Sequence, residues 1–447
     1  MNSTLDKILF KEISNAPLVV FRIAFGALML FSTTRFMLKG WVTDFYVTPK
    51  FHFTYLGFDW IQPLSENGMY IIFSLIVIAC ICIILGYKYR FFAVLFFILF
   101  TYVELIDKTF YLNHYYFVSL MAFLMCFLPA NRRFSLDAKL NPAIRTSTTS
   151  AWHIRILMFQ MGVVYFFAGV AKINTDWLLN AQPLKLWLNG RQDLSSILKQ
   201  EWVAYFASWF GCIYDLLVPF GLLWKRTRPI AYFFVIAFHF ITWMLFPIGV
   251  FPWVMMVGTL IFFSENFHEK ILSRFESPIA KDTFVVKSNL KLVKVLIGAY
   301  ILIQLALPFR YLLYPGNLYW TEEGYRFSWR VMLMEKHGHA QFYIKNNETN
   351  KFIEVNNEDF LEPRQEKQMA TQPDFILQYA HHLKDIYKDS TFQFTDSSQT
   401  WNNIGVHAKI MVTLNGRPSQ LFVDKKHDLT KYKYNLCHRK WIEPFNE

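Results

Sequence analysis

The sequence predicts a mainly α, multi-pass membrane protein, in which a transmembrane bundle of about nine helices precedes a small α+β, β-rich extracytoplasmic domain. The first observation is composition. Of the 447 residues, 54% are hydrophobic and only 17% are charged, whereas soluble domains usually contain about 25% charged residues. The second observation is that apolar runs of about 20 residues, the length that crosses a bilayer, recur until about residue 310.

The expected transmembrane helices are separated by polar breaks, and the tightest break is FPIGVFPW, before the eighth helix. The helices are expected at residues 17–38, 69–87, 91–106, 115–130, 152–171, 203–224, 229–246, 251–264 and 291–310. No basic n-region with a short apolar core and a cleavage site opens the chain. We therefore expect the first helix to remain as a membrane anchor.

Basic residues gather in alternate loops between these helices. They are Lys88 and Arg90; Arg132, Arg133, Lys139 and Arg145; Lys225, Arg226 and Arg228; and Lys270, Arg274, Lys281, Lys287, Lys291 and Lys294. The positive-inside rule places these loops and the N-terminus in the cytoplasm, so the chain after about Arg310 lies outside. The net charge of +12 thus reflects membrane topology, and we expect no nucleic-acid partner.

The pattern of apolar and polar residues changes after Pro308. Short alternating runs predict strands at HAQFYIKN, KFIEVN, HAKIMVTLNG and QLFVD. The run PDFILQYAHHLKDIYKD has apolar residues at helical spacing and predicts one amphipathic helix. The expected domains are therefore a transmembrane helical domain over residues 1–311 and a β-rich C-terminal domain over residues 312–447.

Polar side chains inside apolar runs are costly in a membrane and are candidates for function. Arg22 and Asp215 are expected to form a structural pair or to anchor helix ends. The run ELIDKTFYLNHYYF, residues 104–117, concentrates several polar groups, among them Asn113 and His114.

Lys172 ends the apolar run in VVYFFAGVAKINTDW. One interpretation is a lysine whose ammonium reaches the headgroups along an apolar stem. The other is an amine that burial keeps uncharged for use as a base. The predicted topology places Lys172 at the same membrane depth as Asn113 and His114, and this conjunction favours a shared reaction site.

The sequence contains no P-loop, GxSxG, HExxH or glycine-rich dinucleotide motif. The twelve histidines show no paired metal-ligand spacing within the apolar runs. We therefore expect no metal site.

Five segments, taken in order, resemble the vitamin K-dependent gamma-carboxylase family, whose membrane part is the HTTM domain. They are FRIAFGALML, IDKTFYLNHYYFVSLMAF, VYFFAGVAKINTDW, FHFITWMLFPIGVFPWVM and YRFSWRVML. The resemblance implies a membrane enzyme of the lyase class that oxygenates vitamin K hydroquinone to its epoxide and γ-carboxylates protein glutamate. Its co-substrates would be the lipid-soluble vitamin K hydroquinone, O2 and CO2, and its partners the lipid bilayer and a glutamate-containing protein or peptide.

The resemblance also implies roles for individual residues. Lys172 would be the base that deprotonates the hydroquinone, although animal members carry two lysines where this chain has Ala171 and Lys172. His114, with Asn113, would lie beside the reacting glutamate and the oxygenated quinone.

Other candidates would bind the substrates. Phe327 and Trp329 would belong to the glutamate-binding region, and Arg417 is a candidate anchor for the peptide. His239 and Trp243 are candidates for binding the quinone, with a satisfied core histidine as the alternative interpretation of His239.

Elementary chemistry agrees with this interpretation. The γ C–H of glutamate is too weakly acidic for lysine or histidine, whose pKa values lie near about 10.4 and 6.5. A stronger base must be generated from a co-substrate, in a place from which water is excluded. Two alternatives remain: a quinone-binding or epoxidising family member without protein carboxylation, and a membrane transporter or scaffold. The richness in Lys, Asn, Ile and Phe favours a bacterial inner-membrane protein.

Overall fold

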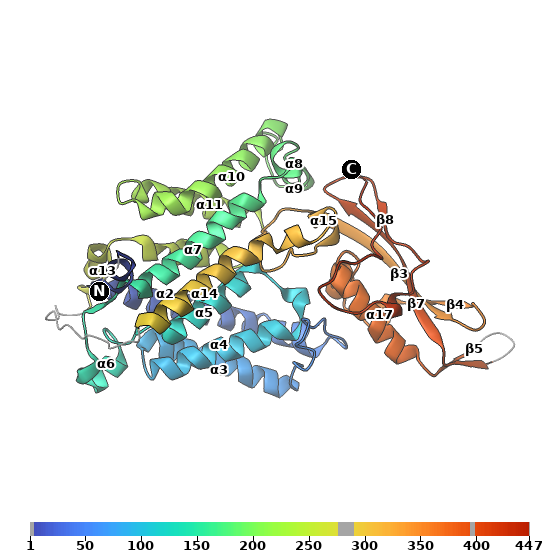
Figure 1. The fold of residues 1–447 in the computed structure, drawn as a ribbon, viewed down its shortest axis with the longest axis horizontal. Coiled ribbons are helices and arrows are strands. Elements are labelled where there is room, and N and C mark those ends of the chain that lie inside the picture. The colour runs from blue at the N-terminus through green and yellow to red at the C-terminus, as the bar shows by residue number, and fades with distance from the viewer. Residues whose placement is uncertain (1–3, 276–289, 394–397, 447) are drawn as a thin grey trace.

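Residues 4–275, 290–393 and 398–446 are described in a computed structural model of the chain. A helical bundle, blue to yellow, and a β-rich domain, orange and red, lie next to each other along the long axis of the molecule (Figure 1). This arrangement confirms the predicted fold class.

Within the described residues, seven helices are long and apolar enough to cross a membrane. They are α2 (Ala16–Leu38), α3 (Glu66–Leu85), α4 (Tyr89–Ile106), α7 (Ala151–Ala171), α10 (Glu201–Leu223), α11 (Arg228–Leu245) and α14 (Leu290–Ala306), which continues into η5 (Leu307–Leu313). The other two predicted runs form shorter helices: α5 (Asn113–Phe127), and α12 (Phe251–Gly258) with η4 (Thr259–Phe262). The chain is thus a multi-pass membrane protein.

Helix α7 lies at the centre of the bundle. In its most apolar stretch, 67% of the residues are buried within the protein, against 11% for α14 and η5, so α14 presents most of its surface outward. Gly169 lets α7 approach α10, because a Cβ at this position would lie 2.7 Å from the backbone nitrogen of Leu216. Small residues allow such close helix contacts in membranes. The contact brings the end of α7 next to the middle of α10.

The described parts of the basic loops gather at the end of the bundle that faces away from the β-rich domain (Figure 1), and Lys281 and Lys287 lie outside the described residues. Arg133 forms an ion pair of 2.9 Å with Glu269 there, and Arg22 donates a hydrogen bond of 2.8 Å to the carbonyl of Ala130. Arg22 also donates to the carbonyl of Ile84 in the last turn of α3 over 3.3 Å, so it anchors a helix end, which was one of its two expected roles, and also the loop after α5. The elements at this end are α1 (Thr4–Phe10), β1 (Glu12–Ser14), α6 (Leu136–Leu140), η3 (Pro142–Ile144), β2 (Thr148–Ser150) and α13 (Glu265–Leu272).

The opposite end of the bundle carries the short elements that meet the β-rich domain. They are η1 (Thr43–Val47), η2 (Lys108–Phe110), α8 (Thr175–Leu178), α9 (Leu184–Gly190) and α15 (Leu318–Thr321). The start of α5 and the end of α7 both lie at this end. Asn113 donates a hydrogen bond to the carbonyl of Arg330, and the hydroxyl of Tyr319 donates one to the carbonyl of Ala171.

The β-rich domain, which we call the outer domain because it lies beyond one end of the bundle (Figure 1), is built on a four-stranded antiparallel sheet in the order β4-β3-β7-β8. Its strands are β3 (Lys336–Asn346), β4 (Phe352–Val355), β7 (Ile404–Leu414) and β8 (Gln420–Val423), which correspond to the four predicted runs. Alternate residues are buried along β3 and in the second half of β7, as expected for a sheet with one face packed, and α17 (Pro373–Tyr387) packs against β7. The remaining elements are η6 (Asn357–Asp359), α16 (Pro363–Met369), η7 (Leu429–Lys431) and the hairpin of β5 (Ser390–Gln393) and β6 (Ser398–Trp401).

The bundle and the outer domain share one apolar core at their junction. Phe53, from the loop between η1 and α3, and Trp177 of α8 are buried in the same cluster as Phe375 of α17. The rings of Phe53 and Phe375 lie 4.4 Å apart. This shared core fixes the outer domain above the ends of α5 and α7, where the candidate site lies.

Candidate functional site

A cavity of about 480 Å³ lies at the junction of the bundle and the outer domain. We call it the junction cavity. Its wall includes the end of α2, η1, η2, the start of α5, the break between α11 and α12, residues 322–334 and α16. Asn113 and His114 both line it, as do four arginines: Arg35, Arg326, Arg330 and Arg364.

Asn113 is held in place by two hydrogen bonds. Its side-chain NH2 donates to the carbonyl of Arg330 over 2.8 Å, and its amide oxygen accepts from the hydroxyl of Tyr111 over 3.1 Å. The same hydroxyl accepts from the backbone N–H of Phe327. Asn113 therefore connects the first turn of α5 to the segment that carries Phe327 and Arg330.

His114 presents its ring to the junction cavity. The ring lies 5.4 Å from that of Phe251 and 4.5 Å from that of Tyr115, measured between centroids. Within the described part of the chain, no protein group hydrogen-bonds to the imidazole of His114. Its ring nitrogens are thus available to a ligand in the cavity.

Lys172 is the residue that follows the last turn of α7, and it faces the interior of the protein. Its Nζ lies 2.6 Å from Oδ2 of Asp215 on α10, and the two side chains are only 7% and 6% exposed. Nζ also donates to the carbonyl of Ala168 over 3.3 Å and lies 5.4 Å from the indole of Trp177. Lys172 therefore does not reach toward headgroups, and its partner is a buried carboxylate.

Lys172 and His114 lie at the same end of the bundle, but Lys172 is not part of the described wall of the junction cavity. Aromatic rings connect the two places. The ring of Phe251 lies 6.0 Å from that of His239, which lies 5.9 Å from Tyr165 and 6.5 Å from Tyr214, the neighbour of Asp215.

The two candidates for quinone binding differ in their surroundings. His239 is 2% exposed and shares a hydrogen bond of 2.9 Å with the carbonyl of Val235, one turn earlier in α11. Trp243 is 44% exposed and lines a second cavity of about 620 Å³ between α2, α11 and α12. We call it the apolar cavity, because Arg35 is the only charged residue in its described wall. The apolar cavity shares Arg35, Gly249 and Val250 with the junction cavity.

Phe327 and Trp329 belong to a segment with unusual backbone geometry. Both residues have left-handed φ angles, 62° and 59°, which are rare for bulky side chains and cluster at functional sites. Trp329 is 1% exposed and stacks on Tyr116, 5.0 Å away, whereas Phe327 lines a third cavity, of about 260 Å³. Trp329 thus supports the cavity walls from behind.

Arg417 lies in the turn between β7 and β8, away from the junction cavity. Its guanidinium forms two hydrogen bonds to Asp176, of 2.8 and 2.6 Å, and Asn415 donates a third, of 2.7 Å. Burial alone would raise the pKa of Asp176, but these hydrogen bonds outweigh it and lower that pKa. The structure places Arg417 in a contact that ties the outer domain to α8.

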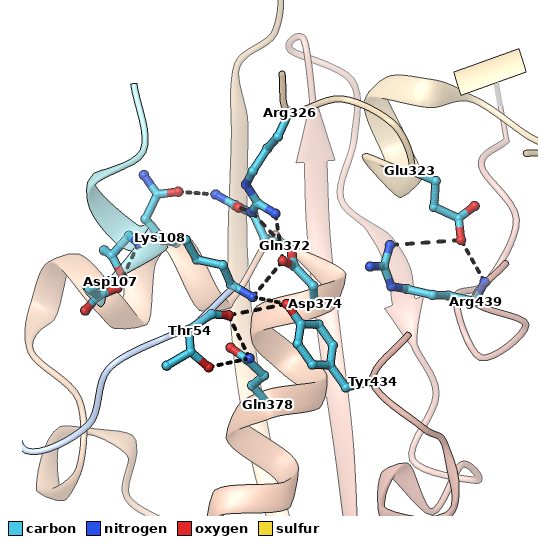
Figure 2. Close-up of polar contacts among 12 residues, drawn as sticks. Thr54, Asp107, Lys108, Glu323, Arg326, Gln372, Asp374, Gln378, Tyr434 and Arg439 are labelled. Carbon is cyan, nitrogen blue, oxygen red and sulfur yellow. Dashed lines mark hydrogen bonds and ion pairs between the residues drawn. The ribbon is translucent and has the colours of Figure 1, made fainter. Parts of the chain in front are cut away.

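A charged network that sequence reasoning missed joins α17 to η2 (Figure 2). Asp374 pairs with Lys108 over 2.8 Å and with Arg326 over 2.6 Å, and Lys108 also donates to the hydroxyl of Tyr434 over 3.0 Å. Burial lowers the pKa of Lys108 to about 8, against the opposing effect of Asp374. Burial would raise the pKa of Asp374, but the charges of Arg326, Lys108 and Arg439 hold it well below its usual range.

The sequence alone could have indicated that Arg326 and Arg330 belong to the site. They flank FSW in the run YRFSWRVML, and two arginines beside a candidate substrate-binding segment indicate an anionic ligand. No sequence pattern indicated a role for Arg35 and Arg364, because only the fold brings α2 and α16 to the junction cavity.

Comparison with known protein families gives two matches. The model of the HTTM domain matches residues 10–267, which cover the described bundle up to α13. The model of the lumenal domain of vitamin K-dependent gamma-carboxylase matches residues 289–447. No solved structure matches the chain.

Proposed function

This chain belongs to the vitamin K-dependent gamma-carboxylase family, and we propose that it oxygenates vitamin K hydroquinone to the epoxide and γ-carboxylates glutamate in a protein or peptide. The observation that carries the proposal is the junction cavity. It combines Asn113 and His114 with four arginines, at the place where the bundle meets the outer domain. An anionic side chain from outside and a lipid-soluble reductant from the bilayer can meet there.

The apolar cavity supports a route for the hydroquinone. Its wall includes Trp243 and Trp253, whose rings lie 5.9 Å apart, and aliphatic residues of α2. A fused aromatic ring system suits such surroundings. The residues shared by the two cavities would bring it to His114.

Lys172 is proposed as the base that takes the phenolic proton. When the amine gains this proton it becomes an ammonium, and the carboxylate of Asp215 at 2.6 Å stabilises the new charge in a place with little water. The rings of Tyr165 and Tyr214 both lie within 6.5 Å of the ring of His239, and their hydroxyls are polar groups through which a proton could pass.

Oxygenation of the hydroquinone anion would supply the strong base that neither lysine nor histidine can be. The γ-carbon of glutamate then gives up its proton, and the electron pair of the broken C–H bond forms the new bond to CO2. In this chain, His114 and Asn113 would hold the reacting groups, and the shared core above them would exclude water.

One assay tests the proposal. Purified protein in lipid nanodiscs is supplied with reduced vitamin K, oxygen, labelled bicarbonate and a glutamate peptide, and both products are measured. We expect epoxide and labelled γ-carboxyglutamate together. Epoxide without carboxyglutamate would indicate a quinone-oxidising family member, and the absence of both products would contradict the proposal.

We also propose that the N-terminus and the basic loops are cytoplasmic and that the outer domain is extracytoplasmic, in a bacterial inner membrane. The gathering of the basic loops at one end of the bundle supports this orientation.

A further inference from the structure

Arg330 is a buried arginine in the wall of the junction cavity, and no carboxylate of the described residues pairs with it. It is 7% exposed, and its Nε has no hydrogen-bond partner. Its guanidinium lies 4.4 Å from the ring of Tyr311 and forms a hydrogen bond with the hydroxyl of Tyr319. Two neighbouring basic side chains do have carboxylate partners: Arg326 pairs with Asp374, and Lys336 pairs with Glu322.

A buried charge without an opposite charge beside it is costly, and a guanidinium cannot lose its proton to avoid the cost. Tyr311 and Tyr319 are neutral, so an anion that enters the cavity would supply the missing counter-charge. The surroundings favour the entry of an anion, because the described wall contains only one acidic residue, Glu322. Glu322 is already paired with Lys336 over 2.8 Å. Arg35 and Arg364 add further positive charge to the wall.

The shape of the guanidinium favours a carboxylate among small anions. Its planar fork can bind both oxygens of a carboxylate at once. The carbonyl of Arg330 accepts the hydrogen bond from Asn113, the residue before His114. A carboxylate on Arg330 would therefore be held at a defined position relative to the imidazole.

We propose that Arg330 binds the side-chain carboxylate of the glutamate substrate, with Asn113 fixing the distance from that carboxylate to His114. This inference rests on the proposed function. Bicarbonate carries the same anionic chemistry, and the experiment must distinguish these two sources.

The test measures binding rather than turnover, on the full chain in nanodiscs. Fluorescently labelled peptides that contain either glutamate or glutamine at one position are titrated against the wild type, Arg330→Gln and Arg330→Lys. We expect Arg330→Gln to weaken binding of the glutamate peptide by at least roughly 30-fold, to leave the glutamine peptide unchanged, and Arg330→Lys to be intermediate. Arg191→Gln is the matched control. Because Arg191 pairs with Asp193 in a loop outside the junction cavity, this variant should bind both peptides as the wild type does.

Three results would overturn the inference. The first is equal affinity of the wild type and Arg330→Gln for the glutamate peptide. The second is Arg330-dependent binding of bicarbonate with unchanged peptide binding. The third covers the case in which Arg330→Gln does not fold: glutarate that fails to compete with the glutamate peptide on the wild type.

Failure of this inference is distinguishable from failure of the proposed function. A wild type that carboxylates while Arg330→Gln binds normally would overturn only the role of Arg330. A wild type that binds glutamate through Arg330 and forms neither product would overturn only the function.

Discussion

The Nζ of Lys172 lies 2.6 Å from Oδ2 of Asp215, between the end of α7 and the middle of α10. The sequence favoured an amine in apolar surroundings, and the structure adds a buried carboxylate beside it. Asp215 is thus placed to stabilise the ammonium that forms when Lys172 takes up a proton.

Replacement of Lys172 by Ala should abolish epoxide formation and carboxylation together, by about 10²-fold or more, because both products depend on the deprotonated hydroquinone. Lys172→Arg should be equally inactive, since arginine keeps its proton. A small exogenous amine should partly restore Lys172→Ala. Both products are measured in the nanodisc assay, with Lys185→Ala as the control, because Lys185 pairs with Glu201 outside the site. A fully active Lys172→Arg would contradict the role of Lys172 as a base.

Asp215→Asn should lower both stability and epoxide formation. The variant leaves a buried ammonium without its counter-charge, which costs about 3–5 kcal/mol, and a proton taken up by Lys172 would no longer be stabilised. The double variant Lys172→Met/Asp215→Asn should regain much of the lost stability and none of the activity. Thermal unfolding in detergent measures the first and epoxide yield the second. A stable Asp215→Asn protein with normal epoxide formation would limit Asp215 to a structural role.

His114→Ala should reduce carboxylation more than epoxide formation, because the imidazole lines the cavity in which the glutamate is expected to bind. The ratio of γ-carboxyglutamate to epoxide should fall by about 10²-fold. His337→Ala, at an exposed histidine of β3, should leave the ratio unchanged. An equal loss of both products would place His114 in the oxygenation step instead.

The sequence predicted the layout of the fold well, because its main signals are local. Apolar runs marked the helices, and alternating residues marked β3 and β7. Asp215 illustrates the limit: it was recognised as costly inside a membrane, but its partner lies 43 residues away and depends on the contact at Gly169. Arg330 shows the same limit, because its lack of a carboxylate partner is a property of the packed structure.

The predicted topology can be checked by cysteine labelling. Lys139 of α6 and Lys431 of η7 are both exposed. Helix α6 lies at the end of the bundle away from the β-rich domain (Figure 1), whereas η7 packs against α17 and β7 of that domain. In a Cys437→Ser background, which removes an exposed native thiol, Lys431→Cys should react with an impermeant reagent added to intact cells. Lys139→Cys should react only after the membrane is opened. Labelling of both positions from the same side would contradict the orientation.

Asp374→Asn should destabilise the junction between the bundle and the outer domain most strongly near neutral pH. It removes the carboxylate that pairs with Lys108 and Arg326, which costs about 3–5 kcal/mol. The pKa of Asp374 is depressed in the folded state, so its contribution is present above the ordinary value of 3.8 and is lost as the pH falls below it.

At basic pH, the stability difference between the wild type and Asp374→Asn depends on the protonation of Lys108. Its pKa falls from 10.5 to about 8 on folding, so the unfolded state binds more protons between these values and the contribution of Lys108 to stability rises with pH there. Once Lys108 is neutral, the loss of Asp374 matters less. The difference in unfolding temperature between the wild type and Asp374→Asn should therefore be largest between about pH 5 and 8 and shrink on both sides. Asp193→Asn, at an exposed ion pair, should show no such profile, and a difference independent of pH would mean that Asp374 stabilises the junction by packing rather than by charge.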